Sequence, residues 1–308
     1  MEPVNFSAKK ANLIRRSELL RAVREAFYAE NFIEVATEVK IPAPAPEEYI
    51  ESVACQGEFL RTSPELAMKQ LLCSGMERIF QIGPAFRAEE KGRKHREEFT
   101  IMEYYAVNWN YRELAEFTAK MLASAAQKLT GKTTLTYRNT PVDFARHTFI
   151  TVDEAFRRYA GVSAFDADKD GSFDEVMVLK VEPNLGKNNP EFLIDYPASR
   201  ASLSRISAAD SRVAERWELY INGIELGNAF GELTDAAEQR RRFAEALKFR
   251  AEAGMLAYPE ASEFLAALEL GMPESSGCAI GFDRLAMIFC DAYDIGEVIF
   301  EAQRNNRY

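Results

Sequence analysis

Apolar side chains recur at helical spacing in several segments of the chain. Over residues 11–31, this spacing predicts an amphipathic helix. Further helices are predicted over 63–75, 111–131, 235–254 and 260–271. In the first of these, Ser63 is expected as the N-cap and Pro64 as the first helical residue. Three prolines at alternate positions should keep segment 41–50 extended or looped.

Strands are predicted mostly as hairpins. The predicted strand segments are 78–90 and 97–109, joined by a charged loop, 217–230 around the turn pair Asn222-Gly223, and the first part of 276–293, which then runs into a helix. Asn-Gly is the pair preferred in a type I′ turn. Because hairpins and helices fall in separate blocks, the sequence predicts an α+β fold with an antiparallel β-sheet flanked by helices. Without repeats or low-complexity linkers, residues 1–308 are expected to form a single domain.

Composition narrows the class of protein further. The chain has 308 residues, 47% of them hydrophobic, and no apolar run near the ~20 residues that span a bilayer. The N-terminus does not resemble a signal peptide, so a cytoplasmic location is expected. Four scattered cysteines and two distant histidines favour reduced thiols over a zinc site. A net charge of -10 without a basic stripe disfavours tRNA or other nucleic acid as a partner.

The first hairpin gathers charged and aromatic side chains. Arg87 and Glu89 lie two residues apart on a predicted strand and would share one face. On the partner strand, Phe99, Glu103 and Tyr105 alternate in the same way. The intervening loop adds basic side chains, namely Lys91, Arg93, Lys94, His95 and Arg96. This combination favours a polyphosphate ligand, although an exposed sheet face with surface ion pairs is the alternative.

The second hairpin brings two carboxylates together. If its Asn-Gly pair forms the turn, Tyr220 pairs with Glu225, and Glu218 shares the face of Tyr220. Glu218 and Glu225 are then diagonal neighbours, ~7–8 Å apart at Cα. Carboxylates this close repel one another unless a cation lies between them, and their oxygens suit Mg²⁺. The alternative is a solvated edge hairpin with two unrelated glutamates.

Glu232 lies seven residues beyond Glu225 in the same predicted strand region. Strict alternation puts the two side chains on opposite faces. Both can line one site only if the strand contains a bulge, for which Gly227 and Gly231 are the candidate positions.

Two other segments raise questions of function. Small residues from 276 to 281 would let a flat ligand approach the backbone, with Arg284 following at a helix start, although tight packing is the commoner reason for them. Residues 166–171 begin like a calcium-binding loop, but Met177 occupies the twelfth position, where a bidentate glutamate is required. The segment is therefore predicted to be a solvated loop that caps a helix.

His147 has no ligand partner nearby in sequence and is interpreted as structural.

The order of these motifs resembles the class II aminoacyl-tRNA synthetases. FRAEE and HREEF (86–99) resemble motif 2, and GFDR (281–284) resembles motif 3. LRTSPELAMKQLL, FTIMEYY and RWELYINGIELGNAFGELTD are similar to the lysyl-tRNA synthetase branch. The first helix begins too early for an N-terminal OB-fold that binds the anticodon. The chain thus resembles the short GenX/PoxA/EpmA family, which attaches (R)-β-lysine to a lysine of elongation factor P.

This resemblance implies a homodimeric ligase that uses ATP and Mg²⁺, with elongation factor P as acceptor and lysine or β-lysine as substrate. Arg87 and Arg284 are the implied catalytic residues. ATP would be bound by Arg87, Glu89, His95, Arg96, Phe99, Glu225, Leu226, Gly281 and Arg284. Mg²⁺ would be held by Glu218 and Glu225. The amino acid would be bound by Ser63, Glu65, Glu103, Tyr105, Asn228, Phe230, Glu232 and Ala279.

Individual roles follow from the same resemblance. Glu89 would hold the adenine amino group, with Phe99 stacked beneath the ring and Arg284 above it. Arg87 would bind the α-phosphate and the substrate carboxylate and stabilise charge in the transition state. Glu232 would pair with the side-chain ammonium of the substrate, because a buried ammonium needs such a partner.

Four departures from the family pattern change these expectations. Arg96 stands where asparagine is usual, and Glu38 replaces the proline of motif 1, which affects the expected dimer interface. Segment 166–181 is shorter than in the family, so the acceptor could differ. Ala279 replaces a glycine of lysyl-tRNA synthetases. Its methyl group favours a shifted amino group and hence β-lysine, a hypothesis that rests on only ~1–3 kcal/mol of discrimination.

Two other functions fit parts of the pattern. A reduced lysyl-tRNA synthetase would charge tRNA, which the acidic charge disfavours. A non-catalytic regulatory paralogue would only bind a ligand or partner. The presence of Arg87, Glu218, Glu225 and Arg284 favours a catalyst, because a binding module has little use for a full phosphate and metal apparatus.

Overall fold

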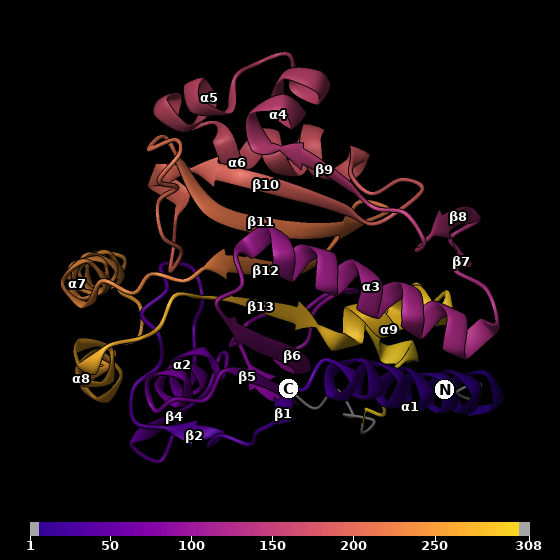
Figure 1. The fold of residues 1–308 in the computed structure, drawn as a ribbon, viewed down its shortest axis with the longest axis horizontal. Coiled ribbons are helices and arrows are strands. Elements are labelled where there is room, and N and C mark those ends of the chain that lie inside the picture. The colour runs from indigo at the N-terminus through magenta and orange to yellow at the C-terminus, as the bar shows by residue number, and fades with distance from the viewer. Residues whose placement is uncertain (1–5, 302–308) are drawn as a thin grey trace.

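An eight-stranded sheet crosses the protein, whose structure is a computed structural model that describes residues 6–301 (Figure 1). Its strands are β1 (Ile33–Glu34), β5 (Arg78–Phe86), β6 (Glu98–Val107), β9 (Thr148–Thr151), β10 (Glu191–Pro197), β11 (Val213–Ile221), β12 (Ile224–Gly231) and β13 (Ser275–Gly281). They lie in the order β1-β5-β6-β13-β12-β11-β10-β9. The interior pairs are antiparallel, as predicted, whereas β1 with β5 and β9 with β10 form parallel pairs at the edges, which was not predicted.

Two small sheets complete the strands. One contains β2 (Lys40–Ile41), β4 (Glu58–Leu60) and β3 (Val53–Cys55), and the other contains β7 (Thr134–Tyr137) and β8 (Thr140–Asp143). Segment 41–50 contains no helix, in agreement with its prolines.

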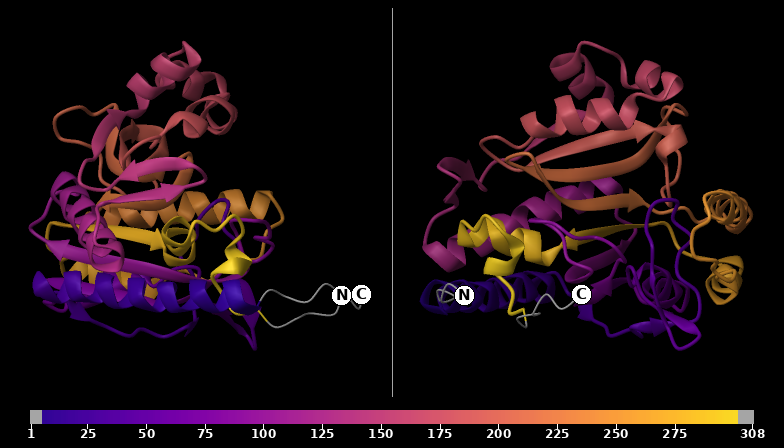
Figure 2. Two further views of the ribbon diagram at one scale, coloured as in Figure 1. Left: turned by 90° about the vertical axis from the view of Figure 1, so that its right-hand side faces the viewer. Right: turned by 180° about the vertical axis from the view of Figure 1, so that it is seen from behind.

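Three helices cover one face of the large sheet. They are α1 (Phe6–Ala29), α3 (Tyr111–Thr130) and α9 (Phe282–Cys290), and Figure 2 shows α1 and α3 side by side along it. Between them and the sheet lies the largest apolar core, in which Phe27 stacks on Phe80 with ring centroids 4.3 Å apart. The buried Trp217 donates its Nε1–H to the main-chain oxygen of Tyr111, 2.7 Å away, which ties α3 to β11.

The opposite face carries the helices nearest to the predicted site. They are α2 (Glu65–Cys73), α7 (Ala236–Glu252) and α8 (Ser262–Leu270), and they enclose a separate apolar core. Alternation along β6 separates the two cores, because Tyr104 belongs to the first and Tyr105 to the second. The remaining helices, α4 (Val152–Ala160), α5 (Ala164–Asp170) and α6 (Phe173–Val176), pack near β9 and β10, followed by a π-helical turn at Met177–Val181.

The predicted helices are confirmed with small shifts at their ends. Asn110 caps α3 by accepting hydrogen bonds from two backbone N–H groups, and Gly131, at φ 72°, ends that helix. The hydroxyl of Ser63 accepts a hydrogen bond from the Glu65 backbone N–H at 3.0 Å, but the helix begins at Glu65. Pro64 therefore precedes the helix rather than forming its first residue.

The prediction of a solvated loop over 166–171 is wrong, because most of this segment belongs to α5. Ala164 and Ala167 are buried in its core-facing side, which accounts for the helix. Asp168 accepts a hydrogen bond from Arg200 Nε at 2.7 Å, so this carboxylate belongs to an ion pair and not to a calcium site.

The turn and bulge of the β11–β12 hairpin determine which side chains share a face. Asn222 and Gly223 have φ of 48° and 71°, as a type I′ turn requires, and Tyr220 pairs with Glu225 as predicted. One extra residue, Leu226, then follows before Gly227 pairs with Leu219. This bulge, at the first of the two predicted positions, puts Glu225 on the same face as Asn228, Phe230 and Glu232.

The described residues, 6–301, bear on three further predictions. Among residues 6–301, no helix has the length and apolar character needed to cross a membrane. All four cysteines are free thiols, so no disulfide contributes to the fold. His147 lies 3.1 Å from Glu116 and edge-on to Phe149, in agreement with its structural interpretation.

We predict that Gly227→Ala destabilises the protein, whereas Gly281→Ala on the neighbouring strand does not. A Cβ at Gly227 would lie 2.7 Å from Ile280 Cγ1 and 2.8 Å from the Ala279 oxygen, but one at Gly281 meets nothing nearer than 3.8 Å. Overpacking of this kind costs about 1–3 kcal/mol. Thermal unfolding should therefore give a clearly lower Tm for the first variant only. Equal Tm values would contradict the tight approach of β12 to β13.

Candidate active site

A cavity of about 1000 Å³ opens on the sheet face that also carries α2 and α7. With the exception of Glu89, every residue predicted for catalysis, ATP, metal or amino acid lines it. These residues are Ser63, Glu65, Arg87, His95, Arg96, Phe99, Glu103, Tyr105, Glu218, Glu225, Leu226, Asn228, Phe230, Glu232, Ala279, Gly281 and Arg284. The convergence of side chains from four strands and two helix starts makes this cavity the candidate active site.

Arg87 and Phe99 lie at one end of the cavity. Arg87 directly follows β5, and its backbone N–H donates to the Glu97 oxygen at 2.8 Å, which extends the hairpin by one residue. The guanidinium carbon lies 5.2 Å from the centre of the Phe99 ring. Among the described residues, the buried Nε–H of Arg87 has no hydrogen-bond acceptor. A buried donor without a partner in a cavity is suited to an anionic ligand.

Arg284 enters the same end from the first turn of α9. Its guanidinium donates to the Glu225 main-chain oxygen at 3.0 Å and lies 2.6 Å from His95 Nε2. Burial first, and the neighbouring Arg284 second, lower the pKa of His95, so the neutral ring nitrogen accepts this hydrogen bond. The buried Asp283 accepts from the Thr100 backbone N–H at 2.7 Å and thereby fixes the start of α9 against β6.

Glu218 and Glu225 face the cavity from adjacent strands, as predicted. Glu218 pairs with Arg216 at 2.6 Å and accepts a hydrogen bond from the Tyr220 hydroxyl at 2.7 Å. Loss of hydration within the cavity and then the like charge of Glu218 raise the pKa of Glu225 to about 7, while 41% of the Glu225 side chain stays accessible to solvent. We call the part lined by Arg87, His95, Arg284, Glu218 and Glu225 the nucleotide end.

These two carboxylates fit a hard divalent cation. They offer only oxygen atoms, and their mutual repulsion would be relieved by a cation between them. Among residues 6–301, no group of three or more His, Cys, Asp or Glu side chains is placed to hold a metal by itself. Mg²⁺ would therefore need phosphate oxygens and water to complete its shell, which is its usual coordination.

The other part of the cavity is acidic, and we call Glu65, Glu103 and Glu232 the amino end. Glu103 is almost fully buried and accepts hydrogen bonds from Ser63 Oγ at 2.7 Å and the Tyr105 hydroxyl at 2.6 Å. Burial and the proximity of Glu65 raise the pKa of Glu103 to about 8. Carboxylates held in this way, with few protein partners, are suited to a cationic ligand.

Gly277 in β13 gives these side chains room. A Cβ there would lie 2.2 Å from Tyr105 Cε1 and 2.5 Å from Glu232 Oε1. The small residues of this strand therefore serve close packing at Gly277, while Ala279 and Gly281 border the cavity itself.

Comparison with known proteins identifies the family. Residues 4–303 match the family described as "tRNA synthetases class II (D, K and N)". The chain belongs to this family. It is 38% identical to the elongation factor P–(R)-β-lysine ligase of Edwardsiella ictaluri, over 95% of each chain. It is also 37% identical to the ligase of the same name from Pectobacterium atrosepticum, over 97% of each chain, and 36% identical to that of Klebsiella pneumoniae, over 95%.

Family membership confirms several predictions from the sequence. It supports the class II synthetase fold, the resemblance to these short relatives and the prediction of an ATP-dependent ligase. The individual roles of the cavity residues stay predictions, because they rest on the resemblance and on position alone.

The structure corrects the placement of Glu89 in this class II synthetase. Strand β5 ends at Phe86, and Glu89 lies in a turn at φ 64° with an exposed side chain, so it does not share a strand face with Arg87. The neighbouring Glu90 lines the cavity instead, and its carboxylate lies 3.7 Å from Arg87 Nη1. The last residue pair of β5 and β6 is Phe86 with Glu98, so residues further into the basic loop do not belong to the strands.

Sequence reasoning missed several residues of the synthetase site. Arg216 lines the cavity and donates to Asn228 Oδ1 at 3.1 Å, and its alternation with Glu218 could have revealed it. Lys69 lies directly behind the amino end, four residues after Glu65 on α2. Glu47 also lines the cavity, but it lies in no segment whose spacing indicated a shared surface. Lys94, which lines the cavity too, belongs to the basic loop that the sequence analysis connected with a polyphosphate ligand.

Arg96 is the residue that departs from the family pattern in the motif 2 loop. Its guanidinium pairs with Asp294 at 3.0 Å and with Glu301, and it donates to the His95 oxygen at 2.9 Å. These contacts hold the loop against the segment that follows α9. The side chain is therefore engaged with protein groups, in contrast to the unpaired donor of Arg87.

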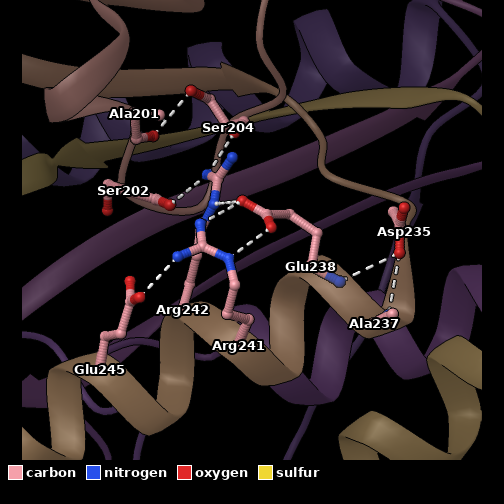
Figure 3. A network of polar contacts seen from close by, with 9 residues as sticks. All are labelled: Ala201, Ser202, Ser204, Asp235, Ala237, Glu238, Arg241, Arg242 and Glu245. Carbon is pink, nitrogen blue, oxygen red and sulfur yellow. Dashed lines mark hydrogen bonds and ion pairs between the residues drawn. The ribbon is translucent and has the colours of Figure 1, made fainter.

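Residues of α7 line one rim of the cavity. Figure 3 shows the polar network that this helix forms. Glu238 accepts hydrogen bonds from both Arg241 and Arg242 at 2.8 Å. Arg242 also donates to the main-chain oxygens of Ser202 and Ser204, each at 2.8 Å. This network joins α7 to the loop after β10, so the rim is a fixed wall of paired charges.

We predict that Glu103→Gln becomes more stable than the unchanged protein as pH rises. A Glu103 pKa raised to about 8 means that the folded state binds the proton more tightly than the unfolded state. The stability that this proton contributes is full below the ordinary pKa of 4.5 and is lost as pH rises through about 8. The difference in Tm between variant and unchanged protein should grow by several degrees between about pH 6 and pH 9.

The exposed Glu175 of α6 provides the control, because Glu175→Gln should give a Tm difference that does not change with pH. A constant Tm difference for Glu103→Gln would show that the carboxyl is not held in its protonated form.

Proposed function

We propose that this protein uses ATP to activate (R)-β-lysine as its adenylate and transfers the lysyl group to a lysine of elongation factor P. The observation that carries the proposal is a single cavity with two ends, one where two guanidinium groups meet a pair of carboxylates and one that is acidic. The names of relatives that are 36–38% identical over at least 95% of the chain support the substrate and the acceptor. We also propose a homodimer, on the resemblance to the family.

In the activation step, a carboxylate oxygen of the amino acid attacks the α-phosphorus of ATP, and the bond to pyrophosphate breaks. Arg87 binds the α-phosphate through the N–H that lacks a protein acceptor and draws negative charge from the phosphorus centre. Arg284 lies against the base and orients it within the cavity. The nucleophile is already ionised, so the step needs no general base and depends on positioning and electrostatics.

Glu218 and Glu225 hold Mg²⁺ in this proposal. When bound, the cation would neutralise phosphate charge. A cation there would favour the ionised form of Glu225, whose pKa is raised to about 7 in the protein alone. Arg216 keeps Glu218 oriented toward Glu225, because Arg216 and Glu218 form an ion pair of 2.6 Å.

In the transfer step, the neutral amine of the acceptor lysine attacks the carbonyl carbon of the adenylate, and AMP leaves. An amide bond forms, and the amine loses a proton to solvent or to the departing phosphate. The amino end holds the ammonium groups of the activated amino acid meanwhile, so that only the acceptor amine reaches the carbonyl. Glu103, fixed by Ser63 and Tyr105, supplies one of these contacts.

The decisive experiment is incubation with ATP, Mg²⁺, one lysine isomer and either elongation factor P or tRNA, with mass analysis of the acceptor. We expect pyrophosphate exchange to be fastest with (R)-β-lysine and elongation factor P to gain one lysyl group. Arg87→Ala should slow exchange by about 100-fold or more, because a preorganised donor to the reacting phosphate is lost. The exposed Arg146 is the matched control, and Arg146→Ala should leave the rate unchanged.

Each contrary outcome has a distinct meaning. Charging of tRNA alone would indicate a reduced lysyl-tRNA synthetase, and no exchange with any isomer would indicate a non-catalytic paralogue. Equal exchange rates with α-lysine and β-lysine would remove the specificity argument from Ala279.

A second prediction concerns the metal. Glu225→Gln should raise the Mg²⁺ concentration for half-maximal exchange by roughly 10-fold or more, because one charged ligand is lost. Glu263 is the control, since it is an exposed carboxylate on α8 that does not line the cavity. Glu263→Gln should leave the Mg²⁺ requirement nearly unchanged. An equal effect of both substitutions would contradict the assignment of the pair Glu218 and Glu225.

A further inference from the structure

A lysine lies fully buried behind the amino end of the cavity. Lys69, on α2, has no exposed side-chain surface, and its Nζ lies 2.5 Å from Glu65 Oε1 and 2.6 Å from Glu232 Oε2. Glu232 is itself buried, with 1% of its side chain exposed. Lys69 does not line the cavity, and yet it contacts two of the three carboxylates of the amino end.

An ammonium group in such a place is costly unless it is paired, and here two carboxylates pair with it. Burial alone would lower the pKa of Lys69, but the charges of Glu232 and Glu65 raise it above its ordinary value, so the group stays charged. Burial raises the pKa of Glu232, and the ammonium of Lys69 opposes that rise. The lysine thus favours the ionised form of the carboxylate that the substrate would meet.

The second oxygen of Glu232 is directed elsewhere. Among the described residues, neither buried oxygen of Glu232 accepts a hydrogen bond of good geometry, although Oε2 lies 2.6 Å from the Lys69 ammonium, and Oε1 has no such cation beside it. A Cβ at Gly277 would lie 2.5 Å from this Oε1 atom, so the lack of a side chain at Gly277 keeps the space beside the oxygen open. One oxygen of Glu232 therefore contacts Lys69, while the other is a buried acceptor without a partner, next to the cavity that Glu232 lines.

We infer that Lys69 is a positioning residue that sets both the charge and the orientation of the amino end. Three carboxylates, Glu65, Glu103 and Glu232, face one internal ammonium, which leaves two negative charges when all are ionised. That balance matches a substrate with two ammonium groups, whose carboxylate is taken by Arg87. The inference rests on the proposed function, since it assumes a diamino acid as substrate.

The test uses amino-acid-dependent pyrophosphate exchange with three substitutions of Lys69. Lys69→Met and Lys69→Gln both remove the charge, and the second can still form hydrogen bonds to the carboxylates, while Lys69→Arg keeps the charge. We expect the two uncharged variants to raise the KM for the diamino acid by roughly 10-fold or more, with the KM for ATP within about 3-fold. Lys69→Arg should recover most of this loss.

Arg24 provides a structural control away from the cavity. Its guanidinium pairs with Glu34 at 2.8 Å, and neither side chain lines the cavity. Arg24→Met should lower the Tm without changing the KM for the amino acid in the protein that remains folded.

Two results would overturn the inference. One is a KM of Lys69→Gln equal to that of the unchanged protein, and the other is a loss of Tm in Lys69→Met with no change in KM. Either would reduce Lys69 to a stabilising core ion pair. A failure of the proposed function would give a different result: the unchanged protein would show no pyrophosphate exchange with any lysine isomer.

Discussion

One inserted residue in β12 is the constraint on which the arrangement of the site depends. Side chains alternate along a strand, so Glu225 and Glu232 would lie on opposite faces of a regular β12. The bulge at Leu226 shifts the alternation by one position, and both carboxylates then face the same cavity. Gly227 makes this possible, because β13 comes too close at that point to leave room for any side chain. The two ends of the cavity are therefore coupled through one local irregularity.

The same arrangement gathers like charges, and this has a cost for the folded state. Glu103 and Glu225 have pKa values raised to about 8 and about 7, so each is held less readily as a carboxylate than in water. Cationic ligands would reverse that cost when they bind, since an opposite charge favours the ionised form. Perturbed carboxyl groups that share a cavity with unpaired donors are typical of functional sites. The stability that these raised pKa values cost is thus linked to the affinity for cationic ligands.

Local chemistry accounts for the features that the sequence predicted well. The type I′ turn at Asn222 and Gly223 needs only two residues with positive φ, and the pairing of Tyr220 with Glu225 follows from it. The sequence indicated a bulge because strict alternation would place Glu225 and Glu232, seven residues apart, on opposite faces of the strand. The helices that were predicted lie within five residues of their predicted bounds, because caps and glycine stops act within one turn, as at Gly131. Helix α4 was not predicted, although Thr151 and Gly161 cap it.

The features that were missed depend on tertiary contacts. Strand β5 ends at Phe86 because its partner ends at Glu98, so Glu89 leaves the sheet although its spacing from Arg87 fits a strand. Lys69 looked like an ordinary helical lysine, and only the packing of α2 against β12 makes it a buried cation. The short parallel pair of β1 and β5 joins segments that no local signal connects. The family resemblance supplied residue roles, but it did not supply these contacts.

In the proposed function, the two ends of the cavity would also fix the direction in which an amino acid binds. With its carboxylate beside Arg87, a diamino acid would place its ammonium groups among Glu65, Glu103 and Glu232, and every charge would have a partner. In the reversed direction, its carboxylate would lie against these three carboxylates, and its ammonium groups would lie near Arg284. A mono-amino acid would bind in the right direction but leave one buried carboxylate unpaired, which costs more than a lost contact. Selectivity for a diamino substrate therefore follows from repulsion and unpaired charge as much as from attraction.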